Sequence, residues 1–356
     1  MAPWRILVTL LPSVACLITA TGQTFWYNGD FNDVHAHANE VNTYIEYAKQ
    51  YDDFDVPEGG RMVGSAWSHN LAYGLDNVVE AEIEVRRGIS EGNGGELLFA
   101  RRLPCVMYRT GRSGFGMLEF GYRVRDVGYF LRPGPYFLNV APVGFGRGRS
   151  FASETTGENG IGTPLNNGNS FFDAPLYGFY FTANDPYWGY PHDFSQGIAA
   201  GGSAAESYDV TQGTVISGSL ARLVNPDDRR LVIRPSLPIS LSRPSAEIVV
   251  QATAGAPPLP RLKIRIETAC SGIPSTRARQ RLELFSFTSN RWVLHDERIP
   301  SVGDSIVEAE LIDGADDYVE PNTLRTWCRI GWYDRGLLNL SWTASVDQVV
   351  WFTGPR

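Results

Sequence analysis

Lysine is almost absent from this chain of 356 residues, because only Lys49 and Lys263 occur and arginine supplies the other 29 of its 31 basic residues. Acidic residues number 39, so the formal net charge is −8 and the isoelectric point is about 5.3. A negative net charge is unfavourable for binding phosphate backbones or anionic lipids. We therefore expect no nucleic-acid partner.

Cysteine is also scarce, with four in the whole chain. One of them, Cys16, lies in the leader described below, and the remaining three cannot form a complete disulfide framework. Cys270 and Cys328 fall in the same half of the chain, where they either pair or serve as small buried residues, and we expect the second. No CxxC or Cys/His zinc spacing occurs, so we expect no structural zinc site.

Long hydrophobic runs are missing except near the start of the chain. Arg5 precedes an uncharged apolar stretch over residues 6–20, and small residues at Ala20 and Gly22 precede Gln23. This pattern predicts a secretory signal peptide over residues 1–22, too short for a membrane span of ~20 residues. A lipoprotein signal ending at Cys16 is an alternative that the weak match around Ser13 disfavours. We expect a secreted or cell-surface protein of bacterial origin, with no transmembrane segment once the leader is removed.

Residues typical of turns, and segments in which apolar and polar residues alternate, make up much of the sequence. The chain has 37 glycines and 22 prolines, and 43% of its residues are hydrophobic. Apolar and charged residues alternate over residues 79–86 and 262–267, as they do in half-buried strands. Further strands are expected at residues 61–67, 116–124, 136–143, 177–182, 231–233, 247–251, 281–287, 306–311, 324–332 and 348–352, and only residues 34–49 could hold a helix. The pattern predicts an all-β protein of two antiparallel, jelly-roll-like β-sandwich modules in tandem.

The boundary between the modules is expected in a stretch rich in glycine, alanine and serine. Residues 199–207 have linker composition, which divides the mature chain into modules over residues 23–198 and 208–356. Residues 23–200 carry 21 acidic against 13 basic residues, and residues 201–356 carry 18 against 17. The negative charge therefore belongs to the N-terminal module.

The N-terminal module also carries four motifs in a fixed order. They are an acidic-aromatic strand, a tryptophan strand, a strand that runs into a glycine-rich turn, and a strand with alternating aliphatic residues, at residues 51–56, 67–70, 83–95 and 134–143. With these motifs the chain, over roughly residues 25–195, resembles exported bacterial β-sandwich proteins of unknown function that often carry PEP-type C-terminal sorting signals. The resemblance implies a secreted or surface sandwich and supplies no catalytic residues. Residues 352–356 show neither a hydrophobic helix nor a basic tail, so we expect no covalent anchor.

Two acidic segments are candidates for calcium, which is the one cofactor that the sequence suggests. The first has oxygen ligands at alternate positions, as in EF-type loops, although it lacks the glycine and the correctly placed final acid of that motif. In the second, crowded carboxylates favour a bound cation. The candidate ligands are Asn28, Asp30, Asn32, Asp33, Asp52 and Asp53. The alternative is a set of solvated acids without an ion.

A histidine pair offers a different metal site. On a strand, His35 and His37 share one face, and Asp33 lies on the same face, so the three could meet one transition-metal ion. The alternative is a solvated loop, because two ligands alone are a weak signal.

Aromatic residues in a polar loop suggest a ligand surface. Tyr187, Trp188 and Tyr190 stand among proline, glycine and acidic residues, close to His192 and Asp193. Aromatic rings of this kind can stack on sugar faces while neighbouring polar groups bind hydroxyls. The alternative is that the rings close the end of the sandwich. The glycine-rich stretch at residues 144–170 is a second candidate, expected as a long loop.

No catalytic constellation is evident. The segment around Ser113 lacks the second glycine of a nucleophile elbow, and the glycine-rich segment at residues 144–149 precedes no helix. The sequence therefore favours an exported, non-enzymatic β-sandwich protein that binds a glycan or another surface polymer. The alternatives are an extracellular hydrolase supported by calcium and a structural spacer without a ligand. The oligomeric state stays open.

Overall fold

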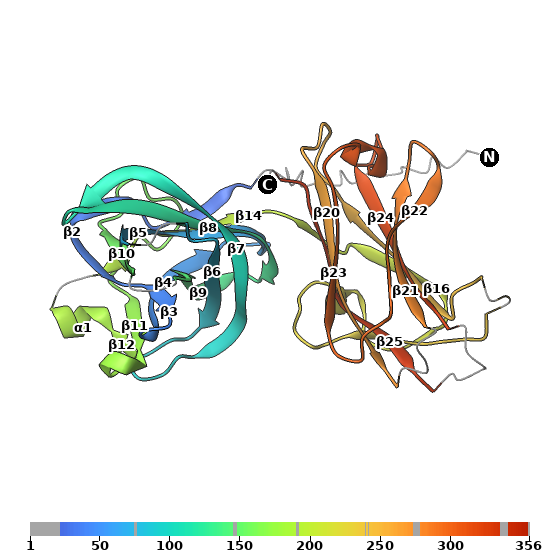
Figure 1. The fold of residues 1–356 in the computed structure, drawn as a ribbon, viewed down its shortest axis with the longest axis horizontal. Coiled ribbons are helices and arrows are strands. Elements are labelled where there is room, and N and C mark those ends of the chain that lie inside the picture. The colour runs from blue at the N-terminus through green and yellow to red at the C-terminus, as the bar shows by residue number, and fades with distance from the viewer. Residues whose placement is uncertain are drawn as a thin grey trace, which may run out of the picture.

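The computed structural model describes residues 22–74, 77–144, 148–189, 192–238, 240, 242–272, 278–334 and 341–354. The predicted signal peptide thus lies almost entirely outside the described residues. Two all-β modules stand side by side, the N-terminal one coloured blue to green and the C-terminal one yellow to red (Figure 1). No helix in the described part of the chain is both long enough and apolar enough to span a bilayer.

The N-terminal module is one continuous antiparallel sheet of 14 strands, counted over the described residues, that folds into two layers. Its strands are β1 (Thr24–Tyr27), β2 (Phe31–Ala38), β3 (Glu40–Asn42), β4 (Glu46–Val56), β5 (Arg61–Tyr73), β6 (Glu80–Arg87), β7 (Glu96–Gly114), β8 (Met117–Leu131), β9 (Gly134–Pro142), β10 (Arg149–Thr155), β11 (Ser170–Ala174), β12 (Phe179–Ala183), β13 (Asp193–Phe194) and β14 (Gln196–Ala200).

Strand β7 joins the two layers because it is long enough to belong to both. Its first half pairs with β6, and its second half, from Cys105 onward, pairs with β8. One layer therefore contains β1, β14, β5 and β8 with β10, β13 and β2 beside β5, and the other contains β6, β9, β4, β11 and β12. Side chains from both layers, such as Trp26, Phe54, Ile83 and Val124, form the buried core between them.

The C-terminal module is a sandwich of two separate antiparallel sheets. The first has the order β17 (Thr214–Ser217), β18 (Leu231–Arg234), β25 (Thr343–Phe352), β20 (Leu262–Ser271) and β23 (Ser305–Leu311), with β15 (Ser203–Ala204) on β25. The second has the order β16 (Ser207–Gln212), β19 (Ala246–Thr253), β24 (Arg325–Tyr333), β21 (Arg279–Ser286) and β22 (Arg291–Arg298). Strict alternation of buried and half-buried residues along β19 and β21 shows why the apolar faces meet.

The structure confirms the predicted all-β class with tandem sandwiches, and it changes several local expectations. Residues 34–49 form no helix but parts of β2, β3 and β4, and the expected loop of residues 144–170 contains β10. The helical segments found in the described residues are short: η1 (Pro175–Tyr177), α1 (Asn184–Trp188), η2 (Leu220–Leu223) and η3 (Ala315–Tyr318). Cys270 and Cys328 are buried free thiols.

The chain passes between the modules over a shorter stretch than the expected linker of residues 199–207. Strand β14 ends at Ala200 and pairs with β1 and β5, whereas β15 begins at Ser203 and pairs with β25. Polar contacts then join the modules: Gln348 donates to the carbonyl of Gly128 at 2.5 Å, and Asn225 donates to that of Phe130 at 2.9 Å. The two modules are therefore packed against each other as well as linked.

Two glycines touch where the chain leaves the N-terminal module. Gly64 lies in an irregular part of β5, and a Cβ placed on it would come 2.5 Å from the Cα of Gly201. Backbone cannot move aside as a side chain does, so we expect Gly64→Ala to lower the free energy of unfolding by about 1–3 kcal/mol. Urea unfolding measures this change. Gly303→Ala, where a Cβ meets nothing within 4 Å, is the control, and equal values for both variants would contradict the steric argument.

Candidate functional site

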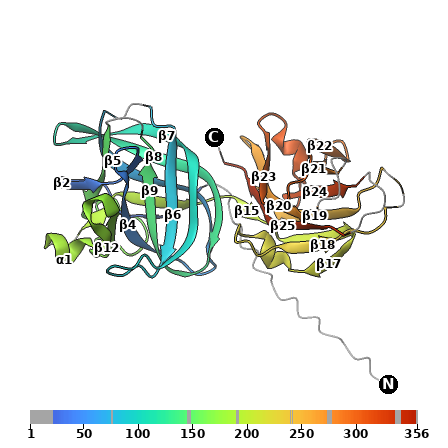
Figure 2. The same cartoon turned by 60° about the horizontal axis from the view of Figure 1, so that its bottom comes forward.

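Strand β12 and helix α1 lie at the end of the N-terminal module that is farthest from the C-terminal module (Figures 1 and 2), and together with η1 they carry four exposed aromatic side chains. They come from three consecutive elements, η1, β12 and α1. The exposed fractions are 47% for Tyr177, 58% for Tyr180, 56% for Tyr187 and 43% for Trp188. We call these four residues the aromatic surface.

Local sequence explains why α1 presents its rings to solvent. The helix ends at Gly189, which adopts a left-handed conformation with φ 81° and donates its N–H to the carbonyl of Asp185 at 2.8 Å. Within this single turn, Tyr187 packs edge-on against Trp188 with 4.9 Å between ring centroids. Tyr187 also rests on Phe179 of β12 at 5.0 Å. Tyr187 is thus held in place by Phe179 and Trp188, and both Tyr187 and Trp188 remain exposed to solvent.

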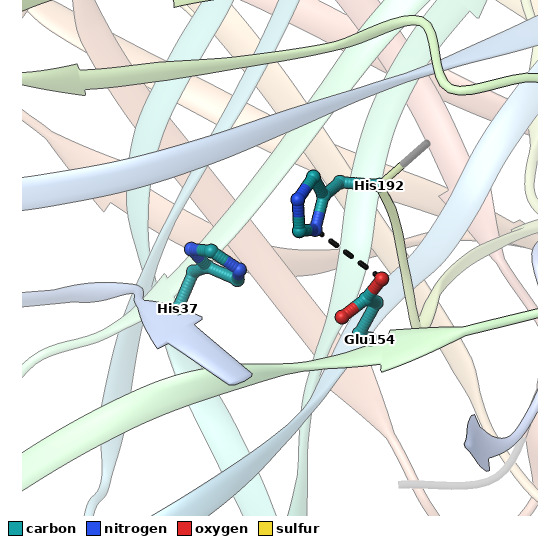
Figure 3. A group of neighbouring side chains, drawn as sticks. All are labelled: His37, Glu154 and His192. Atoms are coloured by element: carbon teal, nitrogen blue, oxygen red, sulfur yellow. Dashed lines mark ion pairs between the residues drawn. The ribbon is translucent and has the colours of Figure 1, made fainter. Parts of the chain in front are cut away.

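Beside Trp188, three metal-ligating side chains meet from three separate segments (Figure 3). His37 lies on β2, Glu154 on β10, and His192 directly before β13. Strand pairing causes this meeting, because β10 pairs with β2 on one side, opposite His37 at Ala152, and with β13 on the other, opposite Phe194 at Glu154. We call His37, Glu154 and His192 the histidine–glutamate cluster.

The cluster is tightly packed. One potential ligand atom from each residue lies within 4.8 Å of the others, and His192 Nδ1 is 3.2 Å from Glu154 Oε1. The ring of His37 is 4.8 Å from that of His192 and 5.2 Å from that of Trp188. Burial, and then the nearby imidazoles of His192 and His35, lower the pKa of His37 to about 3. The ring of His37 is therefore neutral at pH 7, which is the form that coordinates metals.

Next to the cluster lies a buried pair of carboxyl groups. Asp52 is completely buried and accepts hydrogen bonds from Asn28 Nδ2 at 2.8 Å and from the backbone N–H groups of Asp53 and Phe194. Burial, reinforced by the charge of Asp193, raises the pKa of Asp52 well above its ordinary value. Burial also raises the pKa of Asp193 to about 6, while the Gly168 N–H at 3.1 Å opposes the shift. Both carboxyl groups therefore hold their protons to a higher pH than an exposed aspartate does.

The predicted calcium ligands lie in separate networks in the structure. Asn28 and Asp52 contact each other, whereas Asp53 turns to the amides of Asn167 at 3.1 Å and Asn169 at 2.8 Å. Asp30 lies elsewhere, in the arginine-linked network described below. Calcium binding by the six residues stays a prediction.

Two of those ligands lie at the start of β2. The side chain of Asn32 accepts the N–H of Val34 at 2.9 Å, and Asp33 is exposed with a left-handed φ of 62°. In the cluster, Glu154 rather than Asp33 stands beside His37.

The glycan-binding residues predicted from sequence fall into two groups. Tyr187 and Trp188 are exposed on α1, while His192 and Asp193 are 0% and 1% exposed. Tyr190 lies outside the described residues. The last two side chains, His192 and Asp193, therefore support the surface from within rather than form part of it.

A second histidine network lies in the same layer, around His69 of β5. His69 Nδ1 is 2.8 Å from Ser195 Oγ, and His69 Nε2 is 3.0 Å from the hydroxyl of Tyr108. Arg112 links this network to Asp30 at 2.7 Å. Burial, and then the charge of Arg112, lower the pKa of His69 to about 3. The imidazole of His69 is therefore neutral at pH 7, and both of its ring nitrogens lie at hydrogen-bond distance from side-chain hydroxyls.

Sequence reasoning missed Glu154, Asp193 as the partner of Asp52, and the contact between His69 and Ser195. More than 100 residues separate Glu154 from His37, Asp193 from Asp52, and Ser195 from His69. The second partner of Glu154, His192, is nearer in the sequence, at a separation of 38 residues. Strand β10 has only Phe151 and the adjacent Ala152 as apolar residues, so no alternating pattern in the sequence indicates that a strand crosses residues 144–170.

No protein-family model and no curated protein matches this sequence. Solved structures similar to the chain include an allantoicase, with 10% identity, a TM-score of 0.27 and coverage of 94% of this chain and 92% of that one. The tandem CBM22-1–CBM22-2 domain of Xyn10C from Paenibacillus barcinonensis shows 10% identity and a TM-score of 0.30, with 95% and 99% covered. The allantoicase of Saccharomyces cerevisiae shows 12% identity and a TM-score of 0.27, with 94% and 91% covered. Similarity at this level assigns no function to the chain.

Proposed function

We propose that this chain is an exported, non-enzymatic β-sandwich protein that binds a saccharide polymer through the aromatic surface. The observation that carries the proposal is the exposure of Tyr187 and Trp188 on a turn held in place by Phe179 and Gly189. The sequence of residues 1–22 supports export, because it has the n-region, apolar stretch and small residues of a signal peptide.

The exposure of the neighbouring aromatic side chains Tyr187 and Trp188 calls for a functional explanation. Large aromatic side chains usually commit their area to packing, and neighbouring exposed apolar groups mark contact sites on soluble proteins. The faces of pyranose rings carry C–H groups that pack on aromatic rings, and tryptophan and tyrosine are the residues that most often dominate binding energy at interfaces. A polymer is favoured over a small sugar because exposed aromatic side chains occur on three consecutive elements and not on α1 alone.

The test is native affinity electrophoresis of the purified protein in gels that contain neutral soluble polysaccharides: mixed-linkage β-glucan, xylan, mannan and dextran. We expect retardation by at least one of them, and we expect Trp188→Ala to weaken that binding at least about tenfold, because a tryptophan anchor is worth more than about 1.4 kcal/mol. Tyr187→Ala should weaken it in the same direction.

The matched control is Trp292→Ala, the same substitution at a half-buried tryptophan on β22 of the C-terminal module. Circular dichroism and thermal unfolding verify that each variant is folded. The proposal would be contradicted if the protein bound none of the polysaccharides, or if the Trp292 and Trp188 variants lost binding affinity equally.

A further inference from the structure

The histidine–glutamate cluster has the composition of a metal site rather than of an ordinary buried ion pair. Two imidazoles and one carboxylate are the protein ligands of many zinc and non-haem iron centres. Calcium and magnesium, by contrast, take oxygen ligands almost entirely. The three side chains point toward one another from β2, β10 and the residue before β13, as Figure 3 shows.

Distances within the cluster suit a small ion. With ligand bonds of about 2.0–2.2 Å, two ligands of a tetrahedral ion lie roughly 3.4 Å apart. His192 Nδ1 and Glu154 Oε1 are already 3.2 Å apart, and the ligand atoms of all three residues lie within 4.8 Å of one another.

Two buried polar atoms of the cluster lack hydrogen-bond partners. These are Nε2 of His37 and Oε2 of Glu154, and the side chain of Glu154 is only 5% exposed. Buried polar atoms in folded proteins are nearly always paired, and an exception calls for an explanation such as an ion. A cation among the three side chains would satisfy both atoms at once and would compensate the buried carboxylate.

We propose that His37, Glu154 and His192 bind one divalent transition-metal ion per chain. Three protein ligands leave a fourth coordination position for water or another small donor, as in metal sites that are not purely structural. Trp188 lies on one side of the site, with its ring 5.2 Å from that of His37 and 6.5 Å from that of His192. The site therefore adjoins the aromatic surface, although the proposal does not depend on saccharide binding.

The test is isothermal titration of the untagged, chelator-treated protein with Zn²⁺ at pH 7, together with Co²⁺ absorption spectra. We expect one Zn²⁺ per chain, visible Co²⁺ bands that Zn²⁺ removes, and a higher thermal midpoint with Zn²⁺ but not with Ca²⁺. Losing a residue that only orients a ligand costs about 10–100-fold in metal affinity, so Glu154→Gln and His192→Ala should each cost at least about 100-fold.

The Glu154→Gln variant keeps the shape of the side chain, so it tests coordination without opening a cavity. His295→Ala is the control, because the ring of His295, like that of His192, lies beside an aromatic ring, but His295 is half-buried and lies in the other module. Failure of the wild-type protein to bind Zn²⁺ or Co²⁺ would overturn the proposal. So would unchanged affinity in both cluster variants, or a loss in the His295 variant as large as theirs.

Discussion

Replacing Arg261 with alanine is expected to lower the free energy of unfolding by about 3–5 kcal/mol. The Arg261 side chain is 6% exposed and binds both carboxylate oxygens of Asp126 across the boundary between the modules. It also donates to the carbonyl of Gly354 at 2.6 Å and to Glu310 at 3.2 Å. Removing it leaves the carboxylate of Asp126, which is 14% exposed, with Lys263 Nζ at 3.3 Å as its remaining cationic partner, and leaves Gly354 and Glu310 without their hydrogen bonds to Arg261. Removing one partner from a buried ion-pair network is among the costliest single changes in a protein.

Arg261 also lines a groove between the two modules. The groove has a volume of about 500 Å³ and is lined from both modules, among others by Arg101, Lys263 and Glu308. Urea unfolding measures the change in free energy. The control is Arg298→Ala, which removes a surface pair with Asp296 at 35% exposure and should cost about 1 kcal/mol or less. A cost for Arg261→Ala no larger than for this control would show that the contact between the modules carries little stability.

Replacing Asp347 with asparagine is expected to make the protein more stable at pH 8 than the wild type, and to lose that advantage near pH 4. Asp347 is 1% exposed and lies on β25 where its pairing with β20 shifts register between Glu267 and Thr268. Its Oδ2 accepts the N–H of Asp228 at 3.0 Å, whereas its Oδ1 is buried without a hydrogen bond. Burial, and then neighbouring acidic groups, raise its pKa from 3.8 to about 6.

The direction of the pH dependence follows from the difference in proton binding between the folded and the unfolded protein. The folded protein holds the proton of Asp347 up to about pH 6, whereas the unfolded chain releases it near pH 4, so the free energy of unfolding falls as the pH rises through this window. One pKa unit corresponds to about 1.4 kcal/mol, so the pH-dependent part amounts to at most about 3 kcal/mol.

Thermal and urea unfolding between pH 4 and pH 8 measure the difference in stability between the wild-type protein and the Asp347→Asn variant. Asp313→Asn, at an exposed position, provides the baseline for losing one surface charge. A stability advantage of Asp347→Asn that stays constant with pH, or one that falls as the pH rises, would contradict the assignment of a raised pKa to Asp347.

Much of the fold could be predicted from local pattern. The alternation over residues 79–86 and 262–267 corresponds to β6 and β20, because the apolar residues of each strand face a core. The charged faces are more buried than the pattern predicts, since Glu84, Arg265 and Glu267 are also buried. The segments that were predicted differently are those where local pattern is weak. Residues 34–49 mix polar and aromatic residues without a clear period. The pairing of β2 with β10 and of β3 with the start of β4 decides that they form strands.

The candidate site was only partly predictable for the same reason. The aromatic residues of α1 stand out because they lie together in a polar stretch, and their exposure agrees with a binding surface. Glu154 gave no signal, because a single glutamate among glycine, serine and threonine resembles any loop residue. It is the pairing of β10 with β2 and β13 that places Glu154 between two histidines.

By itself, the sequence determined the all-β class, the two modules, the acidic N-terminal half and the aromatic segment, because composition and period-two alternation are local properties. Only the tertiary structure decided which polar side chains meet. His37, Glu154 and His192 are joined by strand pairing between distant segments, and Asp126 meets Arg261 where two modules pack. Burial then changes the chemistry of these groups, and burial depends on the whole fold rather than on neighbouring residues.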